Sequence, residues 1–204
     1  TITYLTCSHG RRQRANVEPG EALLVLGAAG GVGSTAVERG KALGATVIAA
    51  ASSDDKLALC KELGADHTIN YSTESVKDRV KELTGGRGVD VVYDPVGGDF
   101  SEPAVRSMGW NGRYLVIGFA SGPIPSIPLN LTFLKGCSIV GVFWGRFTME
   151  EPEVHLANIE TLWQWFEEGK IKPVITDVFP IEEYEGAYAA MMERRAKGKV
   201  ILTF

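Results

Sequence analysis

The sequence predicts an α/β fold built on a doubly wound, parallel, six-stranded sheet, followed by a C-terminal α+β extension. Three observations lead to this expectation. Strand-like and helix-like segments alternate through the first 150 residues. The strand-like segments are short, continuous apolar runs, which is typical of strands covered by helices on both faces. A glycine-rich turn separates the first such run from a segment of helical length, as expected where a parallel strand crosses over into a helix.

The elements follow one another in a regular order. The helices expected between the early strands end at Gly44 and Gly64, because glycine readily takes the left-handed conformation that closes a helix. A proline-rich stretch at 123–128 is expected to be a loop. The six expected strands lie at 23–28, 46–51, 67–71, 89–96, 112–119 and 138–144, and the helices among the first of them at 32–43, 54–63 and 74–83.

The pattern changes after residue 144. A helix is expected over 151–168, with its apolar stripe packed in the core, and a second helix over 183–196 precedes a last strand. The organisation expected is a linker helix region at 1–20, a dinucleotide-binding domain of the Rossmann type at 21–150 and the C-terminal extension at 151–204. The stripe of the first helix consists of Leu156, Ile159, Trp163 and Phe166.

Composition excludes several classes of protein. A net charge of −4 gives no basic surface for nucleic acid. No apolar run reaches the roughly 18 residues that a membrane-spanning helix needs, and no signal peptide is visible. Cys7, Cys60 and Cys137 are far apart and show no metal-ligand spacing. We therefore expect reduced thiols, no metal site and a cytoplasmic location.

The glycine-rich turn Gly27-Ala-Ala-Gly-Gly-Val-Gly33 is the first candidate site. A glycine at its centre lets the backbone approach a pyrophosphate, and a later one lets the helix pack tightly on the sheet. The helix N-terminus then offers free N–H groups and a partial positive charge to the phosphates. The alternative is a tight turn that binds nothing. The candidate cofactor-binding residues here are Gly30, Gly31, Val32 and Gly33.

The end of the second strand indicates which dinucleotide is bound. An acid at this position, near Ala51, would bind the ribose hydroxyls of NAD, but Ser52 and Ser53 follow instead. A carboxylate about 4 Å from the 2′-phosphate of NADP would repel each unit of its charge by roughly 4 kcal/mol at an effective dielectric constant near 20, so its absence favours NADP(H). Asp54 and Asp55 oppose this unless they begin the next helix, where the helix dipole favours acids.

Lys56 completes this second candidate site, because its ammonium group could bind the 2′-phosphate together with Ser52 and Ser53. The alternative for Lys56 is a solvated surface residue.

Taken in order, several stretches resemble one family. They are LVLGAAGGVG, KALGATVIAAASSDDK, ELGADHTINY, GGRGVDVVYDPVGG, GRYLVIGFASG and GVFWG. Together they are similar to the zinc-free NADPH:quinone oxidoreductase branch of the medium-chain dehydrogenase/reductase superfamily, from about residue 17 to 204. The resemblance implies NADPH-dependent reduction of small molecules, either quinones or alkenes conjugated to a carbonyl.

The resemblance also implies residue roles. Lys56, Tyr71 and Arg195 match residues that contact the 2′-phosphate. The segment 138–144 matches an edge strand that often pairs across a two-fold axis, so a homodimer is expected. No catalytic acid or base is indicated, since hydride transfer is the chemistry of the cofactor. The residues that match the nicotinamide side are Val96, Gly97, Ile117, Gly118, Phe119, Phe143, Trp144 and Gly145.

Members of this family have an upstream catalytic domain, to which the segment from about residue 172 normally returns. We expect this chain to lack that domain and to be inactive or weakly active when isolated. Two stretches depart from the family pattern. GRRQR at 10–14 places charge where an apolar helix is expected, and Arg39 with Gly40 is expected to weaken the packing of the helix after the glycine loop.

Two other functions stay open at this point. One is a non-catalytic NADPH-binding sensor or subunit. The other is an enoyl reductase of a lipid or polyketide pathway, which would look similar in this region.

Overall fold

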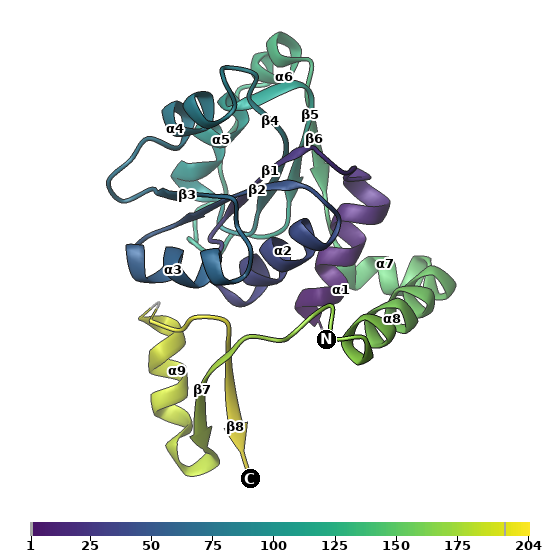
Figure 1. The fold of residues 1–204 in the computed structure, drawn as a ribbon, viewed down its shortest axis with the longest axis vertical. Helices are drawn as coiled ribbons and strands as arrows, with labels where there is room; N and C mark the ends of the chain where they lie inside the picture. Colours follow the sequence, from purple (N-terminus) through teal and green to yellow (C-terminus); the bar gives the residue numbers. More distant parts are fainter. Residues whose placement is uncertain (1, 194) are drawn as a thin grey trace.

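A computed structural model describes residues 2–193 and 195–204, and its centre is the parallel sheet that the sequence predicts (Figure 1). The strand order is β3-β2-β1-β4-β5-β6, and each neighbouring pair runs parallel. The chain therefore winds outward in both directions from the β1/β4 pair, where the order of connection reverses. The six strands are β1 (Ala22–Leu26), β2 (Thr46–Ala51), β3 (His67–Asn70), β4 (Val89–Asp94), β5 (Met108–Val116) and β6 (Ser138–Gly141).

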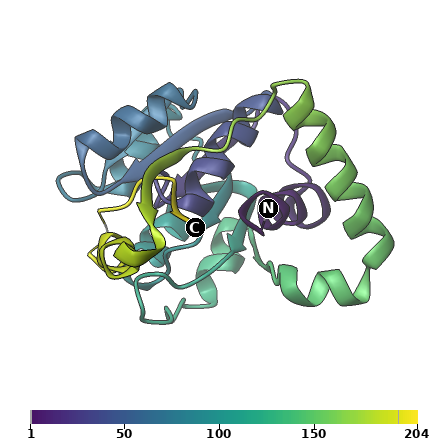
Figure 2. The ribbon, with the colours of Figure 1, turned by 90° about the horizontal axis from the view of Figure 1, so that it is seen from below.

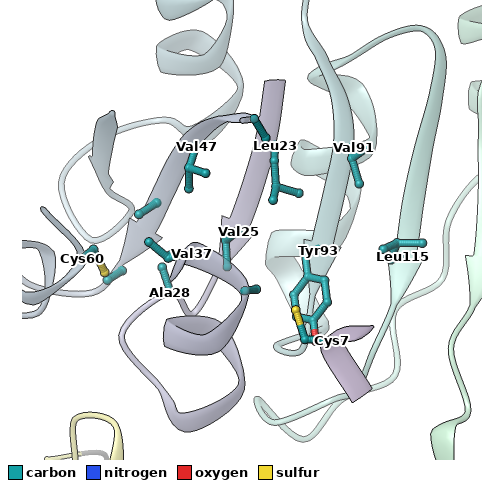
Figure 3. Packing of buried hydrophobic residues seen from close by; sticks show 14 of the residues in the cluster. Cys7, Leu23, Val25, Ala28, Val37, Val47, Cys60, Val91, Tyr93 and Leu115 are labelled. Carbon is teal, nitrogen blue, oxygen red and sulfur yellow. The ribbon is translucent and has the colours of Figure 1, made fainter. Parts of the chain in front are cut away.

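Helices cover both faces of the sheet. On one face α2 (Gly31–Ala42) and α3 (Asp54–Glu62) bury apolar side chains against β1, β2 and β4 (Figure 3). On the other face lie α4 (Val76–Leu83), α5 (Ser101–Arg106) and α6 (Asn130–Lys135). Consecutive strand residues alternate between the two clusters, as Leu23 and Leu24 do. This explains why the central strand β1 is apolar throughout and β2 nearly so, rather than alternating with polar residues.

The N-terminal helix adds a third packed element to the first face. It consists of α1 (Ile2–Ser8) and a π-helical turn, η1 (His9–Ala15), which ends at Asn16 in the left-handed conformation. Arg11 lies in this turn and is 0% exposed, and its guanidinium nitrogens have no hydrogen-bond partner among the described residues. The expected charge in a core position is therefore confirmed, and burial lowers the pKa of Arg11.

The second departure from the family pattern has a different outcome. Arg39 is also buried, but its Nη1 donates a hydrogen bond to Ser8 Oγ at 2.8 Å, and its guanidinium lies 4.7 Å from the ring centre of Trp165. A Cβ at Gly40 would lie 2.7 Å from Val47 Cγ2 and 2.9 Å from Leu23 Cδ2. The expected weakening at Gly40 is therefore wrong, because the missing side chain lets α2 lie close to β1 and β2.

The last strand of the sheet is shorter than the sequence suggested. β6 ends at Gly141, and Trp144 begins a further helix, α7 (Trp144–Glu150). The prediction of a strand as far as Trp144 is therefore wrong. Among the described strands β6 lies at the edge and pairs with β5, in a ladder that ends with Val116 opposite Gly141. An edge strand has no second neighbour to extend it beyond that point.

The apolar stripe expected on the next helix, α8 (Pro152–Glu167), is only partly buried. Leu156, Trp163 and Phe166 are 58%, 62% and 49% exposed, so their assignment to the core is wrong. The helix instead packs on the seven-residue α1, which covers a narrow strip that includes Leu162 and the partly buried Ile159. Figure 2 shows α8 beside the N-terminal helix.

The part of the C-terminal extension that follows α8 lies below the sheet in Figure 1. It contains β7 (Ile175–Pro180), the short turn η3 (Ile181–Glu183), α9 (Tyr184–Met192) and β8 (Lys199–Thr203), and β7 and β8 pair in parallel. Among the described residues, hydrogen bonds and an ion pair between Lys197 and Asp55 attach it to the rest of the chain. Lys172 N donates to Glu38 Oε1 at 2.6 Å, Gly198 N donates to Ala29 O at 3.0 Å, and Lys199 Nζ donates to Thr3 Oγ1 at 2.8 Å.

The close contact at Gly40 leads to the first prediction. Gly40→Ala should lower the free energy of unfolding by about 1 kcal/mol, because overpacking of about 1–3 kcal/mol outweighs the better helix propensity of alanine, about 1 kcal/mol. Urea unfolding followed by circular dichroism measures this change. The control is Gly186→Ala in α9, where a Cβ would make an ordinary 3.5 Å contact with Phe179. This variant should be as stable as the unmodified chain or more so. Equal stabilisation by both substitutions would show that Gly40 is not a packing requirement.

Candidate functional site

A cavity of about 630 Å³ opens at the carboxyl ends of the strands, at the point where the strand order reverses. In doubly wound folds this is the position where ligands bind. The cavity brings together the glycine loop, the ends of β2 and β3, the turns after β4 and β5, and α9. Its lining consists of Gly27, Ala29, Gly30, Gly31, Val32, Gly33, Ala51, Lys56, Tyr71, Pro95, Val96, Ile117, Gly118, Phe119, Ala120, Ser121, Met191, Met192 and Ala196.

The glycine loop has no room for side chains at its tightest point. A Cβ at Gly33 would lie 2.2 Å from Gly27 O and 2.8 Å from the Cα of Ala28. Gly27 has φ +57°, and Gly30 caps the start of α2 without a side-chain hydrogen bond. In the first turn of the 12-residue α2, Gly31 and Gly33 bring only backbone to the cavity and Val32 adds one apolar side chain, which leaves N–H groups and the positive end of the helix dipole for an anion.

The far end of the cavity is lined by a lysine and by no acid. Lys56 Nζ donates a hydrogen bond to Ser52 Oγ at 3.2 Å, and the ring of Tyr71 lies 4.5 Å from the ring of Phe100. Ser53 caps α3 by accepting a hydrogen bond from Lys56 N at 3.5 Å. None of the described residues that line the cavity is acidic.

The two acids after β2 take the helical alternative that the sequence left open. Both lie in the first turn of α3, which begins at Asp54. Asp54 Oδ1 accepts a hydrogen bond from Asn70 Nδ2 at 2.8 Å, and Asp55 forms an ion pair with Lys197. Each acid is therefore bound to a donor from another segment.

A buried carboxylate holds the turn after β4. Asp94 is 2% exposed and accepts hydrogen bonds from Val96 N at 2.7 Å, Gly97 N at 2.9 Å and Ser101 Oγ at 2.9 Å. The hydroxyl of Tyr114 donates to the same carboxylate. Burial, and then the neighbouring charge of Asp94, raise the pKa of Tyr114, so the phenol stays protonated as a donor. Asp94 thus fixes the backbone beside the cavity.

Most of the predicted site residues meet in this cavity. Ser52 and Ser53 lie beside it, bonded to the side chain and the backbone of Lys56. Gly97 also lies beside it. Its φ is +71°, and a Cβ at this position would lie only 2.9 Å from Phe119 Cδ1, so a side chain does not fit. The predicted residues that line the cavity are Gly30, Gly31, Val32, Gly33, Lys56, Tyr71, Val96, Ile117, Gly118 and Phe119.

Four other predicted residues do not line the cavity. Phe143 lines a separate hollow of about 500 Å³ that also includes His9. Trp144 packs in the cluster around α1, and Gly145 O accepts a hydrogen bond from Thr148 Oγ1 at 2.8 Å. The exposed Arg195 pairs with Glu193 at 2.6 Å.

Sequence reasoning missed several lining residues. Pro95, Ala120 and Ser121 follow strand ends, so their position after an apolar run was an available signal. Met191 and Met192 lie on α9, more than sixty residues beyond the other lining segments. No local pattern indicates that this helix returns to the cavity.

Two expected absences can be examined within residues 2–193 and 195–204. In this part of the chain no three His, Cys, Asp or Glu side chains are grouped so that they could hold a metal ion. Over the same residues, no helix has the length and apolar character needed to cross a bilayer.

Comparison with known proteins places this geometry in a family. The family model described as zinc-binding dehydrogenase matches residues 31–161. The quinone oxidoreductase-like protein 2 of Bos taurus is 40% identical over 203 residues, which are 99% of this chain and 58% of the bovine protein. The chain therefore spans less than two thirds of this relative's length.

Solved structures give the same result. A quinone oxidoreductase of Pseudomonas syringae superposes with a TM-score of 0.91 at 34% identity, covering 100% of this chain and 63% of that one. A quinone oxidoreductase of Escherichia coli, crystallised in complex with NADPH, superposes with a TM-score of 0.92 at 28% identity, with the same coverage of 100% and 63%.

The carboxylate under the turn after β4 leads to the second prediction. Asp94→Ala should lower the free energy of unfolding by about 3 kcal/mol, because it leaves several buried donors without an acceptor. Chemical denaturation measures the loss. Asp99→Ala is the matched control, since Asp99 is exposed on the adjacent turn, and it should change stability by less than about 0.5 kcal/mol. Similar losses in the two variants would contradict the role assigned to Asp94.

Proposed function

The chain belongs to the zinc-binding dehydrogenase family, within the medium-chain dehydrogenase/reductase superfamily, and from this premise we propose that it is the cofactor-binding portion of an NADPH-dependent oxidoreductase that reduces quinones or conjugated enones. The observation that carries the proposal is a cavity that joins a glycine-rich loop, tightly packed at Gly33, to an end lined by a lysine and by no acid. This combination suits a dinucleotide with a phosphorylated ribose. The likeness to quinone oxidoreductases supports the reaction class.

The residues present fit the phosphates of NADPH. Gly30, Gly31 and Gly33 would hold the pyrophosphate against the start of α2, where a Cβ at Gly33 could not be accommodated. Lys56, together with Ser52 and Tyr71, would hold the 2′-phosphate. A carboxylate in their place would repel that group, which carries about −1.5 to −2 charges near neutral pH.

The opposite end of the cavity is apolar and suits a nicotinamide ring. Val96, Ile117 and Phe119 line it, and Gly97 and Gly118 keep the backbone close. When bound, the nicotinamide would supply the hydride, and these residues would orient the ring and exclude water. Contacts of Phe143, Trp144, Gly145 and Arg195 with the cofactor stay predictions, because these residues lie outside the cavity.

The proposal extends to assembly and location. The apolar edge strand β6, in which Ile139 is 39% exposed, is a candidate for pairing with β6 of a second copy. The two-stranded sheet of β7 and β8 is small for an independent unit and would join further strands in a longer protein. Cys7, Cys60 and Cys137 are free thiols, which supports a cytoplasmic location.

Nucleotide titration tests the cofactor assignment. The chain should bind NADPH at least tenfold more tightly than NADH in calorimetry, and Lys56→Glu should remove that preference, because it reverses the charge facing the 2′-phosphate. The control is Lys61→Glu, which makes the same charge change at the other end of α3 and should keep the preference. Binding of neither nucleotide, or an unchanged preference in Lys56→Glu, would refute the assignment.

Turnover tests the reaction. The chain alone should oxidise NADPH only slowly in the presence of a quinone, because half of the substrate cleft would come from a part of the protein that relatives place outside the matched region. Adding the corresponding upstream portion of a relative in trans should raise the rate. Restored turnover on acyl thioesters but not quinones would favour an enoyl reductase. No turnover in any combination, despite NADPH binding, would favour a sensor or subunit.

A further inference from the structure

The segment 195–199 passes along the rim of the cavity in a fixed path. Gly198 N donates to Ala29 O in the glycine loop at 3.0 Å, and the two segments form a parallel bridge at Gly30 and Gly198. Thr176 Oγ1 donates to Lys197 O, and Lys199 N donates to Val174 O at 2.9 Å. The backbone on either side of the Lys197 side chain is therefore held by β7 and by the glycine loop.

The side chain of Lys197 reaches across the rim to α3. Its ammonium group forms an ion pair with the carboxylate of Asp55, the residue just before Lys56. The lysine side chain is 30% exposed and the aspartate side chain 73% exposed. As a surface ion pair it would contribute little to stability. The pair can still change how strongly Asp55 repels another negative charge nearby.

A phosphate bound at Lys56 would lie close to two acids of the same helical turn. Asp54 is bonded to Asn70 of β3, a neutral donor. Asp55 is also exposed, and Lys197 is the cation that the structure places on it. Without this lysine, the negative charges of Asp55 and a 2′-phosphate would face each other across a short, solvent-accessible distance.

We propose that Lys197 is a specificity residue for the phosphorylated nucleotide, acting by neutralising Asp55 at the rim of the cavity. The proposal rests on the proposed function, since it concerns the same nucleotide site. Lys197 favours NADPH because it removes a repulsion that only the 2′-phosphate meets. NADH carries no such phosphate and is indifferent to the pair.

This role differs from that of the other cations at the site. Lys56 lines the cavity and would meet the phosphate directly. Arg195, which the sequence suggested for this end, is paired with Glu193 of its own segment. Lys197 acts through an acid on another element, so its effect should vanish when that acid is removed.

The test is a double-mutant cycle on the full 204-residue chain, with NADPH and NADH affinities measured by calorimetry. Lys197→Ala should weaken NADPH binding about three- to tenfold and leave NADH binding unchanged, which also shows that the variant is folded. Asp55→Asn in the Lys197→Ala background should restore NADPH affinity, and Lys197→Arg should preserve it. The control is Lys170→Ala, which breaks the ion pair with Glu168, a residue that does not line the cavity, and should alter neither affinity.

The outcomes separate the two levels of the proposal. If the unmodified chain prefers NADPH but Lys197→Ala keeps that preference, the role of Lys197 is refuted and the proposed function stands. A loss that Asp55→Asn does not restore would refute neutralisation as the mechanism. If the unmodified chain binds neither nucleotide, or binds both equally, the proposed function fails and the role of Lys197 fails with it.

Discussion

The close approach of α2 to the sheet is the constraint on which the rest of the structure depends. At its first turn the helix meets the glycine loop, where Gly33 faces the carbonyl of Gly27, and near its end Gly40 lies against Val47 and Leu23. Two glycines seven residues apart lie on the same face of a helix, so they let it lie flat against β1 and β2. This placement brings the helix N-terminus to the edge of the sheet. Across the cavity from the glycine loop, Asp94 fixes the turn after β4 by accepting hydrogen bonds from its backbone N–H groups.

The sheet and the near side of the cavity could be predicted because they depend on local signals. Continuous apolar runs mark strands that are covered on both faces, and residues just after such runs must lie at one edge of a parallel sheet. Lys56 was found because two serines and a lysine follow the second strand, where an acid would bind the ribose of NAD. The same reasoning failed for the end of β6 and for the stripe on α8. There the outcome depends on how far β5 extends and on how little surface α1 covers.

The buried arginines show a second kind of feature that the sequence alone could not predict. The sequence indicated that Arg11 and Arg39 occupy apolar positions, but it could not show how each is accommodated. Arg39 finds the hydroxyl of Ser8 and the face of Trp165, whereas Arg11 is enclosed without a described hydrogen-bond partner. An enclosed guanidinium lowers the net stability of the fold. The junction of α1 and α2 is held by polar bonds such as the one from Tyr4 Oη to Glu38 Oε2 at 2.6 Å, whereas the charge of Arg11 in η1 is held by packing alone.

The hydrogen bond between Gly198 and Ala29 ties the C-terminal extension to the loop at the centre of the cavity. Thermodynamic linkage makes such a tie reciprocal. Any ligand that binds better when the extension is docked must hold the extension in place by the same free energy. Ligand binding in the cavity and docking of the segment that contains β7, α9 and β8 would then be coupled, so that each favours the other. Protection of the C-terminal backbone amides from hydrogen exchange would rise and fall with ligand concentration.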